Sequence, residues 1–208
     1  MAKKSPLFIL ASASKGRFGL LETMGLLPDK VVPADIDETP HKGELPPDFV
    51  LRLAKEKAAV VAAKYPDAYI VAADTIAAAG RRIIGKAEDE AAARKTLRLL
   101  SGRRHKVFTG VCVIGPRNQK SAKRVMTVVE FKRLSDAEIE GYLASKQWEG
   151  KSGCYGIQSR AGGFIASING SFSNVVGLPL VEATQMLAGL GFKHPALSNV
   201  QDVETAPG

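Results

Sequence analysis

The order of the apolar segments constrains the fold more than any other feature of the sequence. Residues 7–11 and 69–73 are apolar runs of strand length, and segments with helical spacing separate them. Residues 107–114 and 122–134 then flank the polar turn 115–118, and the second of these segments alternates along its length. Strands that first interleave with helices and then pair as a hairpin predict an α/β fold with a mixed sheet.

Five segments carry helical patterns with start or stop signals. Pro46 and Pro47 open one of them, because proline is tolerated in the first helical turn. Ser135 and Glu138 have the spacing of a capping box in another. The expected helices cover residues 18–24, 46–64, 88–100, 135–145 and 178–190. Further strands are expected at residues 30–34 and 164–168, and a hairpin around Gly80 at residues 76–84.

The length of 208 residues fits one domain, which we expect to have two lobes and to cover residues 1–194. Residues 195–208 are expected to form a flexible C-terminal tail. The apolar run at residues 7–11 is too short for the core of a signal peptide. We found no apolar stretch long enough to span a bilayer, so we expect a cytoplasmic protein without a membrane partner.

The charge balance favours an anionic partner. The formal net charge is +8, from 29 Lys and Arg against 21 Asp and Glu, which suits nucleic acid, an anionic membrane or a phosphorylated small molecule. The basic clusters at residues 103–106 and 123–124 contain no interleaved aromatic side chains, so we do not expect a nucleic-acid binder. Cys112 and Cys154 lie far apart in sequence and indicate neither a disulfide framework nor a zinc site.

Lys57 is the first candidate for chemistry. In the helix expected at residues 46–64, Lys57 falls within the stripe of apolar residues that share one face. A lysine on the inward face needs an anionic partner or a route to solvent. The alternative is a side chain that snorkels from the edge of the stripe, and periodicity alone leaves both interpretations open.

Asp74 follows the apolar run 69–73 and is expected at the carboxyl end of a strand, where ligands gather in α/β sheets. Such a carboxylate can hold Mg²⁺ or deprotonate a water. Asp35, Asp37 and Glu38 follow the strand expected at residues 30–34 and could complete a metal site. Taken alone, Asp74 is explained more simply as a turn or cap residue, and the acidic cluster as a solvated loop.

Residues 12–17 lie between the first strand and the first helix. Backbone N–H groups at a helix start, the hydroxyls of Ser12 and Ser14, and the charges of Lys15 and Arg17 could together cradle a phosphate. The alternative is a serine that caps the helix, with exposed basic neighbours. The segment 145–152 ends like a P-loop but lacks its first glycine and follows a helix, so we reject that match.

A series of short motifs occurs in a fixed order along residues 7–190. They are Leu10-Ala-Ser-Ala-Ser14, Asp37-Glu38, Arg52-Leu-Ala-Lys-Glu-Lys57, Ala73-Asp-Thr75, Gly85-Lys86, Leu100-Ser-Gly102 with His105, Val107-Phe-Thr-Gly110, Tyr155-Gly-Ile-Gln158, Asn169-Gly-Ser171 and Val175-Val-Gly-Leu-Pro-Leu180. In this order and spacing they resemble the Maf family of nucleotide pyrophosphatases. The resemblance implies an inosine-triphosphatase-like fold, a mixed twisted sheet with flanking helices and two lobes around a central cleft.

The resemblance also implies a metal-dependent enzyme that cleaves nucleoside triphosphates into the monophosphate and pyrophosphate. Asp74 would be the catalytic carboxylate, and Glu38 would help it to hold Mg²⁺ or Mn²⁺, or else Co²⁺. Such cations must neutralise charge on the phosphates and on the departing pyrophosphate. The triphosphate would be gripped by Ser12, Arg17 and the catalytic lysines Lys57 and Lys86. A homodimer is a further expectation at the level of the family.

Thr75 and Gln158 resemble the branch of the family that acts on dTTP and UTP, whereas the branch that prefers 7-methyl-GTP carries other residues at both positions. The family loop reads Ser-x-Ser-Pro-Arg-Arg, but this chain has Lys15 and Gly16 in place of the proline and the first arginine. The loop therefore lacks one guanidinium, for which Lys15 can substitute only as a point charge. Two alternatives follow: a preference for another base such as 7-methyl-GTP, or a nucleotide-binding regulator linked to septum formation.

Overall fold

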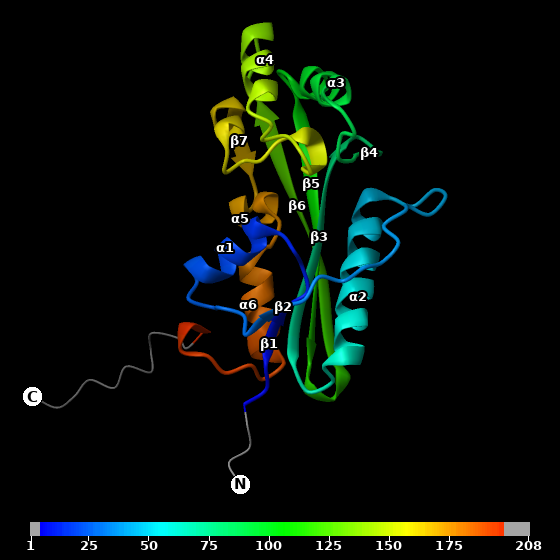
Figure 1. Ribbon diagram of the computed structural model, residues 1–208, viewed down its shortest axis with the longest axis vertical. Helices are drawn as coiled ribbons and strands as arrows, with labels where there is room; N and C mark the ends of the chain where they lie inside the picture. Colours follow the sequence, from blue (N-terminus) through cyan, green and yellow to red (C-terminus); the bar gives the residue numbers. More distant parts are fainter. Residues whose placement is uncertain (1–4, 198–208) are drawn as a thin grey trace, which may run out of the picture.

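The computed structural model describes residues 5–197 as a mixed α/β structure built on one twisted sheet (Figure 1). Seven strands make up this sheet in the order β2-β1-β3-β5-β6-β7, with β4 paired to β3. β1 runs parallel to β2 and β3, and the other pairs are antiparallel. The strands are β1 Phe8–Leu10, β2 Lys30–Val31, β3 Tyr69–Ala79, β4 Arg82–Ile84, β5 Arg104–Gly115, β6 Gln119–Phe131 and β7 Ile165–Asn169.

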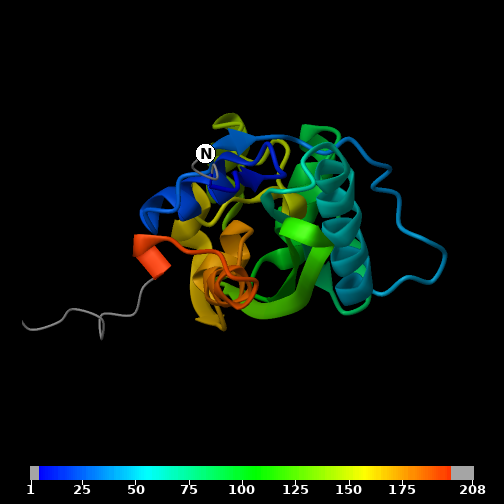
Figure 2. The ribbon, with the colours of Figure 1, turned by 90° about the horizontal axis from the view of Figure 1, so that it is seen from below.

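The helices cover both faces of the sheet. α2 lies along one face, and α1 and α6 lie on the other, as the two views in Figures 1 and 2 agree. α3 and α4 gather at one end of the sheet, beyond α2 (Figure 1). The helices are α1 Lys15–Thr23, α2 Pro46–Lys64, α3 Glu90–Leu100, α4 Asp136–Ala144, α5 Phe172–Val176 and α6 Leu180–Gly189.

Strand β3 is buried on both faces, and its alternation decides which helices its side chains meet. Ile70 and Ala72 belong to the cluster that packs under α2, whereas Val71 and Ala73 pack against α1 and α6. Because successive side chains of a strand point to opposite faces, Asp74 faces α2 and Thr75 faces α1. A third cluster, rich in aromatic rings, fills the end of the sheet near α3 and α4.

The structure confirms the mixed α/β class and most of the expected elements. α2 covers the residues expected from its two prolines, and α4 begins at a capping box of Ser135 and Glu138. The hairpin turns at Gly80, whose φ of 61° favours glycine. The short helix α5 was not predicted from the sequence. Pro195–Leu197 form one short 3₁₀ turn, and the rest of the expected tail lies outside the described residues.

The prediction that Asp74 lies at the carboxyl end of a strand is wrong. β3 continues to Ala79, so that Asp74 and Thr75 lie in the middle of the strand, paired with Gly110 and Thr109 of β5. The strand continues because Ile76 and the alanines after it are buried between β4 and β5. β2 is also shorter than expected, since it covers only Lys30–Val31. In the part of the chain that the structure describes, no helix has the length and hydropathy needed to cross a membrane.

Candidate active site

The site is centred on a buried ion pair between α2 and β3. The Nζ of Lys57 lies 2.6 Å from Asp74 Oδ1 and 2.6 Å from Glu38 Oε1. The whole residues Lys57 and Asp74 are each only 8% exposed. Lys57 is therefore an inward lysine with anionic partners, which decides between the two interpretations that its spacing left open. Asp74 is not a turn or cap residue, because it lies within the sheet.

Close packing of α2 on the sheet brings this pair together. Gly110 lies opposite Asp74 on β5, and a Cβ atom at this position would come within 2.1 Å of Val50 O in α2. Only glycine allows the helix backbone to approach a strand this closely. Val50 and Lys57 are separated by two helical turns and lie on the same buried face of α2. The contact at Gly110 thus sets the height of Lys57 above Asp74.

Glu38 reaches the site from the loop between β2 and α2. Its other carboxylate oxygen, Oε2, lies 3.9 Å from Nζ of Lys86, whose side chain is 62% exposed. Burial acts to raise the pKa of Glu38, but the hydrogen bond and charge of Lys57, helped by Lys86 and Arg17, lower it overall. Asp37 instead turns outward and accepts a hydrogen bond from the Thr39 backbone. Glu38 is therefore the residue of the acidic cluster that joins the site.

Arg17 forms the second part of the site, on the face of β3 opposite Asp74. Its Nε donates to Gly177 O over 2.8 Å, its Nη1 to Ser12 Oγ over 2.9 Å and its Nη2 to Thr75 Oγ1 over 3.2 Å. Burial lowers the pKa of Arg17, while the nearby carboxylates act in the opposite direction. Ser14 caps α1 by accepting from the Arg17 backbone, as one of the two interpretations of this loop expected.

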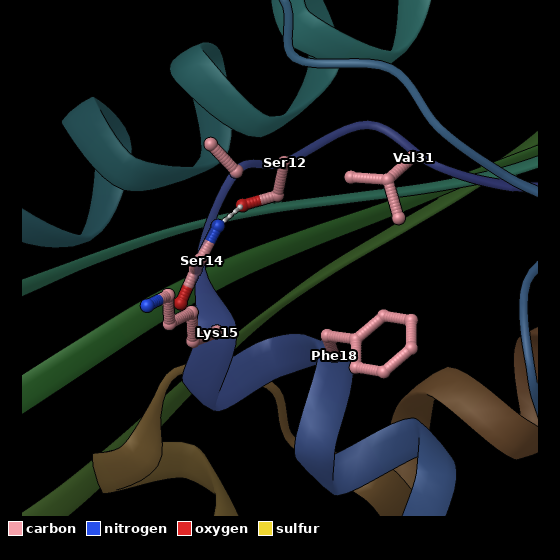
Figure 3. A pocket seen from close by; sticks show the side chains of 6 residues that line it. Ser12, Ser14, Lys15, Phe18 and Val31 are labelled. Atoms are coloured by element: carbon pink, nitrogen blue, oxygen red, sulfur yellow. Dashed lines mark hydrogen bonds between the residues drawn. The ribbon is translucent and has the colours of Figure 1, made fainter.

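A pocket of about 400 Å³ opens where this loop enters α1 (Figure 3). Ser12 and Ser14 line it on the loop side, where Ser14 N donates to Ser12 Oγ over 3.2 Å. Phe18 and Val31 supply apolar walls (Figure 3). Lys15 also lines the pocket. The pocket therefore combines a hydroxyl-lined edge, a positive charge and apolar surface, which suits a phosphorylated ligand that carries a flat ring.

Gln158 lies beside the start of α1. A Cβ atom added to Gly16 would come within 3.6 Å of Gln158 Oε1 and 3.3 Å of Val176 Cγ1. Thus the position where the family motif has its first arginine faces the predicted base-reading glutamine. Each of the other predicted site residues forms a hydrogen bond or an ion pair with another residue of the set. These residues are Ser12, Arg17, Glu38, Lys57, Asp74, Thr75 and Lys86.

Glu38 and Asp74 suit a divalent metal that also binds phosphate. Both carboxylates reach the same Nζ atom, so a cation placed between them could replace the charge of Lys57. Within residues 5–197 there is no group of three or more His, Cys, Asp and Glu suited to a metal ion. Mg²⁺ is commonly bound by one or two carboxylates together with substrate phosphates and water. The donor set therefore fits a cation that arrives with a nucleotide.

Three residues of this region were given no role from the sequence, although Thr109 and Gly177 lie within motifs that carry the family resemblance. Thr109 and Asn174 are fully buried, and Thr109 Oγ1 lies 2.9 Å from Thr75 Oγ1. The backbone oxygen of Gly177 accepts from Arg17. A lone threonine within the apolar strand 107–114 was the available signal for Thr109. The contacts of Asn174 and Gly177 could not be predicted from the local pattern, because they join segments that lie far apart in the chain.

His105 lies outside the site and has a structural role. It is 3% exposed, and its Nε2 lies 2.8 Å from the Tyr155 hydroxyl. Its ring packs edge-on against Phe131 and Tyr155. Burial lowers the pKa of His105 to about 4.

Because histidine in an unfolded chain has a pKa of about 6.5, the unfolded state binds this proton more tightly than the folded state. We therefore expect His105 to lower the free energy of unfolding as the pH falls from about 6.5 to about 4, by up to about 3 kcal/mol. Urea unfolding between pH 7 and pH 4 measures this slope. His105→Gln should flatten it, whereas His41→Gln, at an exposed position, should not. An unchanged slope in His105→Gln would contradict the assignment.

Sequence comparisons relate the chain to a family of known proteins. The family model described as "Maf-like protein" matches residues 7–190. The dTTP/UTP pyrophosphatase of Caulobacter vibrioides is 55% identical over 188 residues, which are 90% of this chain and 97% of that protein. The nucleoside triphosphate pyrophosphatase of Ehrlichia chaffeensis is 51% identical over 180 residues, or 86% of this chain and 94% of the relative.

Among solved structures, the Staphylococcus aureus Ham1 protein is similar with a TM-score of 0.41 and 18% identity, covering 59% of this chain and 70% of that chain. The family match spans all the elements that carry the site, from the loop before α1 to the helix α6. The relatives match the chain over most of their own lengths. The chain therefore belongs to the Maf-like protein family.

Proposed function

We propose that this chain hydrolyses dTTP and UTP to the nucleoside monophosphate and pyrophosphate, with the help of a divalent cation. The names of its relatives support the reaction and the substrates. The observation that carries the proposal is Lys57 held between Asp74 and Glu38 in a mostly buried position. Two carboxylates around the Lys57 ammonium group place a possible base and metal ligands beside a positive charge. Hydrolysis of a triphosphate needs these groups together.

Asp74 is the group that takes the proton from the attacking water. It is fixed within the sheet, and its Oδ1 accepts a hydrogen bond from Lys57, so its carboxylate is positioned before substrate arrives. Glu38 and Asp74 would together hold a cation, Mg²⁺, Mn²⁺ or Co²⁺, which supplies charge neutralisation at the phosphates when bound. Lys57 then faces the phosphate chain with its ammonium group. Lys86, at the exposed edge, binds the departing pyrophosphate.

Arg17, Ser12 and the pocket beside them hold the nucleotide on the other face of β3. Arg17 supplies a guanidinium suited to phosphate oxygens. Thr75 and Gln158 read the pyrimidine ring with hydroxyl and amide groups, a role that rests on the family resemblance. A Cβ atom at Gly16 would lie 3.3 Å from Val176 Cγ1, so glycine here lets the start of α1 pack closely on Val176 and beside Gln158.

The test is a panel of triphosphates with Mg²⁺ and the purified chain. We expect monophosphate and pyrophosphate from dTTP and UTP, and much slower turnover of CTP, GTP and 7-methyl-GTP. Pyrophosphate is measured separately from orthophosphate, because cleavage at the outer phosphate would give orthophosphate instead. Products from 7-methyl-GTP alone would keep the reaction and overturn the base preference. Binding of dTTP without products, even with Mn²⁺ or Co²⁺, would favour the regulator.

A further inference from the structure

A buried threonine lies behind the residues that the proposed function uses. Thr109, on β5, is fully buried and lies opposite Thr75 in the register of β3 and β5. The two hydroxyl oxygens are 2.9 Å apart. On its other side, Thr109 Oγ1 donates to the backbone oxygen of Asn174 over 3.0 Å. Thr109 thus connects Thr75, which Arg17 contacts, to the helix α5.

The number of protons fixes the direction of these hydrogen bonds. Each threonine hydroxyl has one proton to donate. If Thr109 donates to the buried Asn174 oxygen, it can only accept from Thr75. Thr75 has a second acceptor in Gly177 O, but that contact is longer, at 3.3 Å, and Gly177 O already accepts from Arg17 Nε over 2.8 Å. The arrangement that leaves no carbonyl unpaired directs the Thr75 proton to Thr109.

With its proton committed, Thr75 presents only lone pairs to Arg17 Nη2, which lies 3.2 Å away. A hydroxyl free to rotate would instead point its proton at Gly177 O or toward the guanidinium for part of the time. The other two donors of Arg17 bind Ser12 and Gly177. A fixed acceptor at Thr75 therefore completes the set of contacts that holds the guanidinium in one place.

Asn174 is itself held firmly, so the far end of this chain of hydrogen bonds does not move. Its Nδ2 donates to Val107 O over 3.2 Å and to Thr127 Oγ1 over 3.0 Å. Its backbone N–H donates to Ser171 Oγ over 3.1 Å, which caps α5. A fixed acceptor at one end gives Thr109 a single orientation, and Thr109 passes that orientation to Thr75.

We propose that Thr109 is a positioning residue of the active site, which sets the direction of the Thr75 hydroxyl and through it the place of the Arg17 guanidinium. The inference rests on the proposed function, since Arg17 is taken to bind the nucleotide. Thr109 touches no substrate, and its whole effect passes through Thr75. The effect of Thr109 on substrate binding should therefore disappear when Thr75 is removed, whereas a purely structural effect should not.

The experiment is a double-mutant cycle measured by dTTP and UTP hydrolysis. In the otherwise wild-type chain, Thr109→Val should raise KM at least about tenfold and change kcat by less than about threefold, because a contact to a charged binding group is weakened. Thr109→Ser keeps the hydroxyl and should restore KM. In a chain that already carries Thr75→Val, adding Thr109→Val should change KM by less than about twofold, since nothing remains for Thr109 to orient.

Thr184→Val is the control for the loss of a threonine hydroxyl. Thr184 lies in α6, and its hydroxyl donates to Leu180 O over 2.8 Å and to Val181 O over 3.1 Å, within its own helix. This variant should leave KM unchanged. Thr109→Ala, which leaves a small cavity in place of a methyl group, serves if Thr109→Val does not fold. A melting temperature for every variant keeps stability and KM apart.

An equal rise in KM from Thr109→Val in both backgrounds would overturn the proposal, and so would a failure of Thr109→Ser to restore KM. A wild-type chain that does not hydrolyse dTTP or UTP would overturn the proposed function instead. If that chain still binds dTTP, the same cycle is measured on the Kd. Should neither Val nor Ala fold, Thr109→Cys, whose thiol is a weaker donor, should show faster exchange of the Arg17 Nη protons than the wild-type chain when followed by NMR, and unchanged exchange would overturn the proposal.

Discussion

Replacing Asp74 with asparagine is expected to abolish turnover, lowering kcat by at least about a thousandfold. Asparagine has nearly the same shape, but its amide cannot take up a proton from water, and it is a weaker ligand for a hard cation. Lys57 keeps Glu38 as a charged partner, so no buried cation is left unpaired, and the fold should remain intact. The measurement is release of monophosphate and pyrophosphate from dTTP, together with the melting temperature.

Asp37→Asn is the control for this variant. Asp37 belongs to the same acidic segment as Glu38, but its carboxylate accepts from the Thr39 backbone and takes no part in the ion pair with Lys57. It should therefore hydrolyse dTTP at close to the wild-type rate. Near-normal activity in Asp74→Asn would remove Asp74 from the catalytic role. Equal losses in both variants would point to a general effect of negative charge near the site.

Helical spacing alone predicted that Lys57 falls within the apolar stripe of α2, but it did not decide between an inward lysine with an anionic partner and one that snorkels to solvent. α2 begins and ends where its sequence signals place it, so the face of each residue follows. The position of Asp74 was not predictable in the same way. A charged residue after an apolar run usually marks the end of a strand, but here a lysine from α2 balances the charge. Tertiary pairing overrode the local pattern.

The part of the site around Arg17 depends on contacts that no local pattern contains. Arg17 and Gly177 are 160 positions apart, yet they share a hydrogen bond. Thr109 and Asn174 are 65 positions apart and do the same. The sequence does predict a polar loop before α1, because helix starts have their own signals. It does not indicate that the arginine turns inward, since that requires the strand order of the whole sheet.

Gly110→Ala should have the second large effect, on both stability and activity. The new Cβ would lie 2.1 Å from Val50 O, 2.4 Å from Val50 C and 2.7 Å from Leu51 Cα. All three are backbone atoms, so no side-chain rotation relieves the clash, and α2 must move away from the sheet. We expect a loss of about 3 kcal/mol or more in the free energy of unfolding. A shift of about 1 Å in Lys57 should also lower kcat/KM by up to about a hundredfold.

Gly141→Ala is the control, because it makes the same change from glycine to alanine without a clash. Gly141 lies within α4, and a Cβ atom there would meet nothing within 4 Å. Alanine is the better helix former, so this variant should gain up to about 1 kcal/mol in the free energy of unfolding and keep its activity. Urea unfolding and dTTP hydrolysis are measured for both chains. If Gly110→Ala unfolded at the wild-type urea concentration, α2 could not lie this close to β5, and the 2.6 Å contact between Lys57 and Asp74 would lose its structural basis. If stability fell but kcat/KM did not, the height of Lys57 above Asp74 would not limit the reaction.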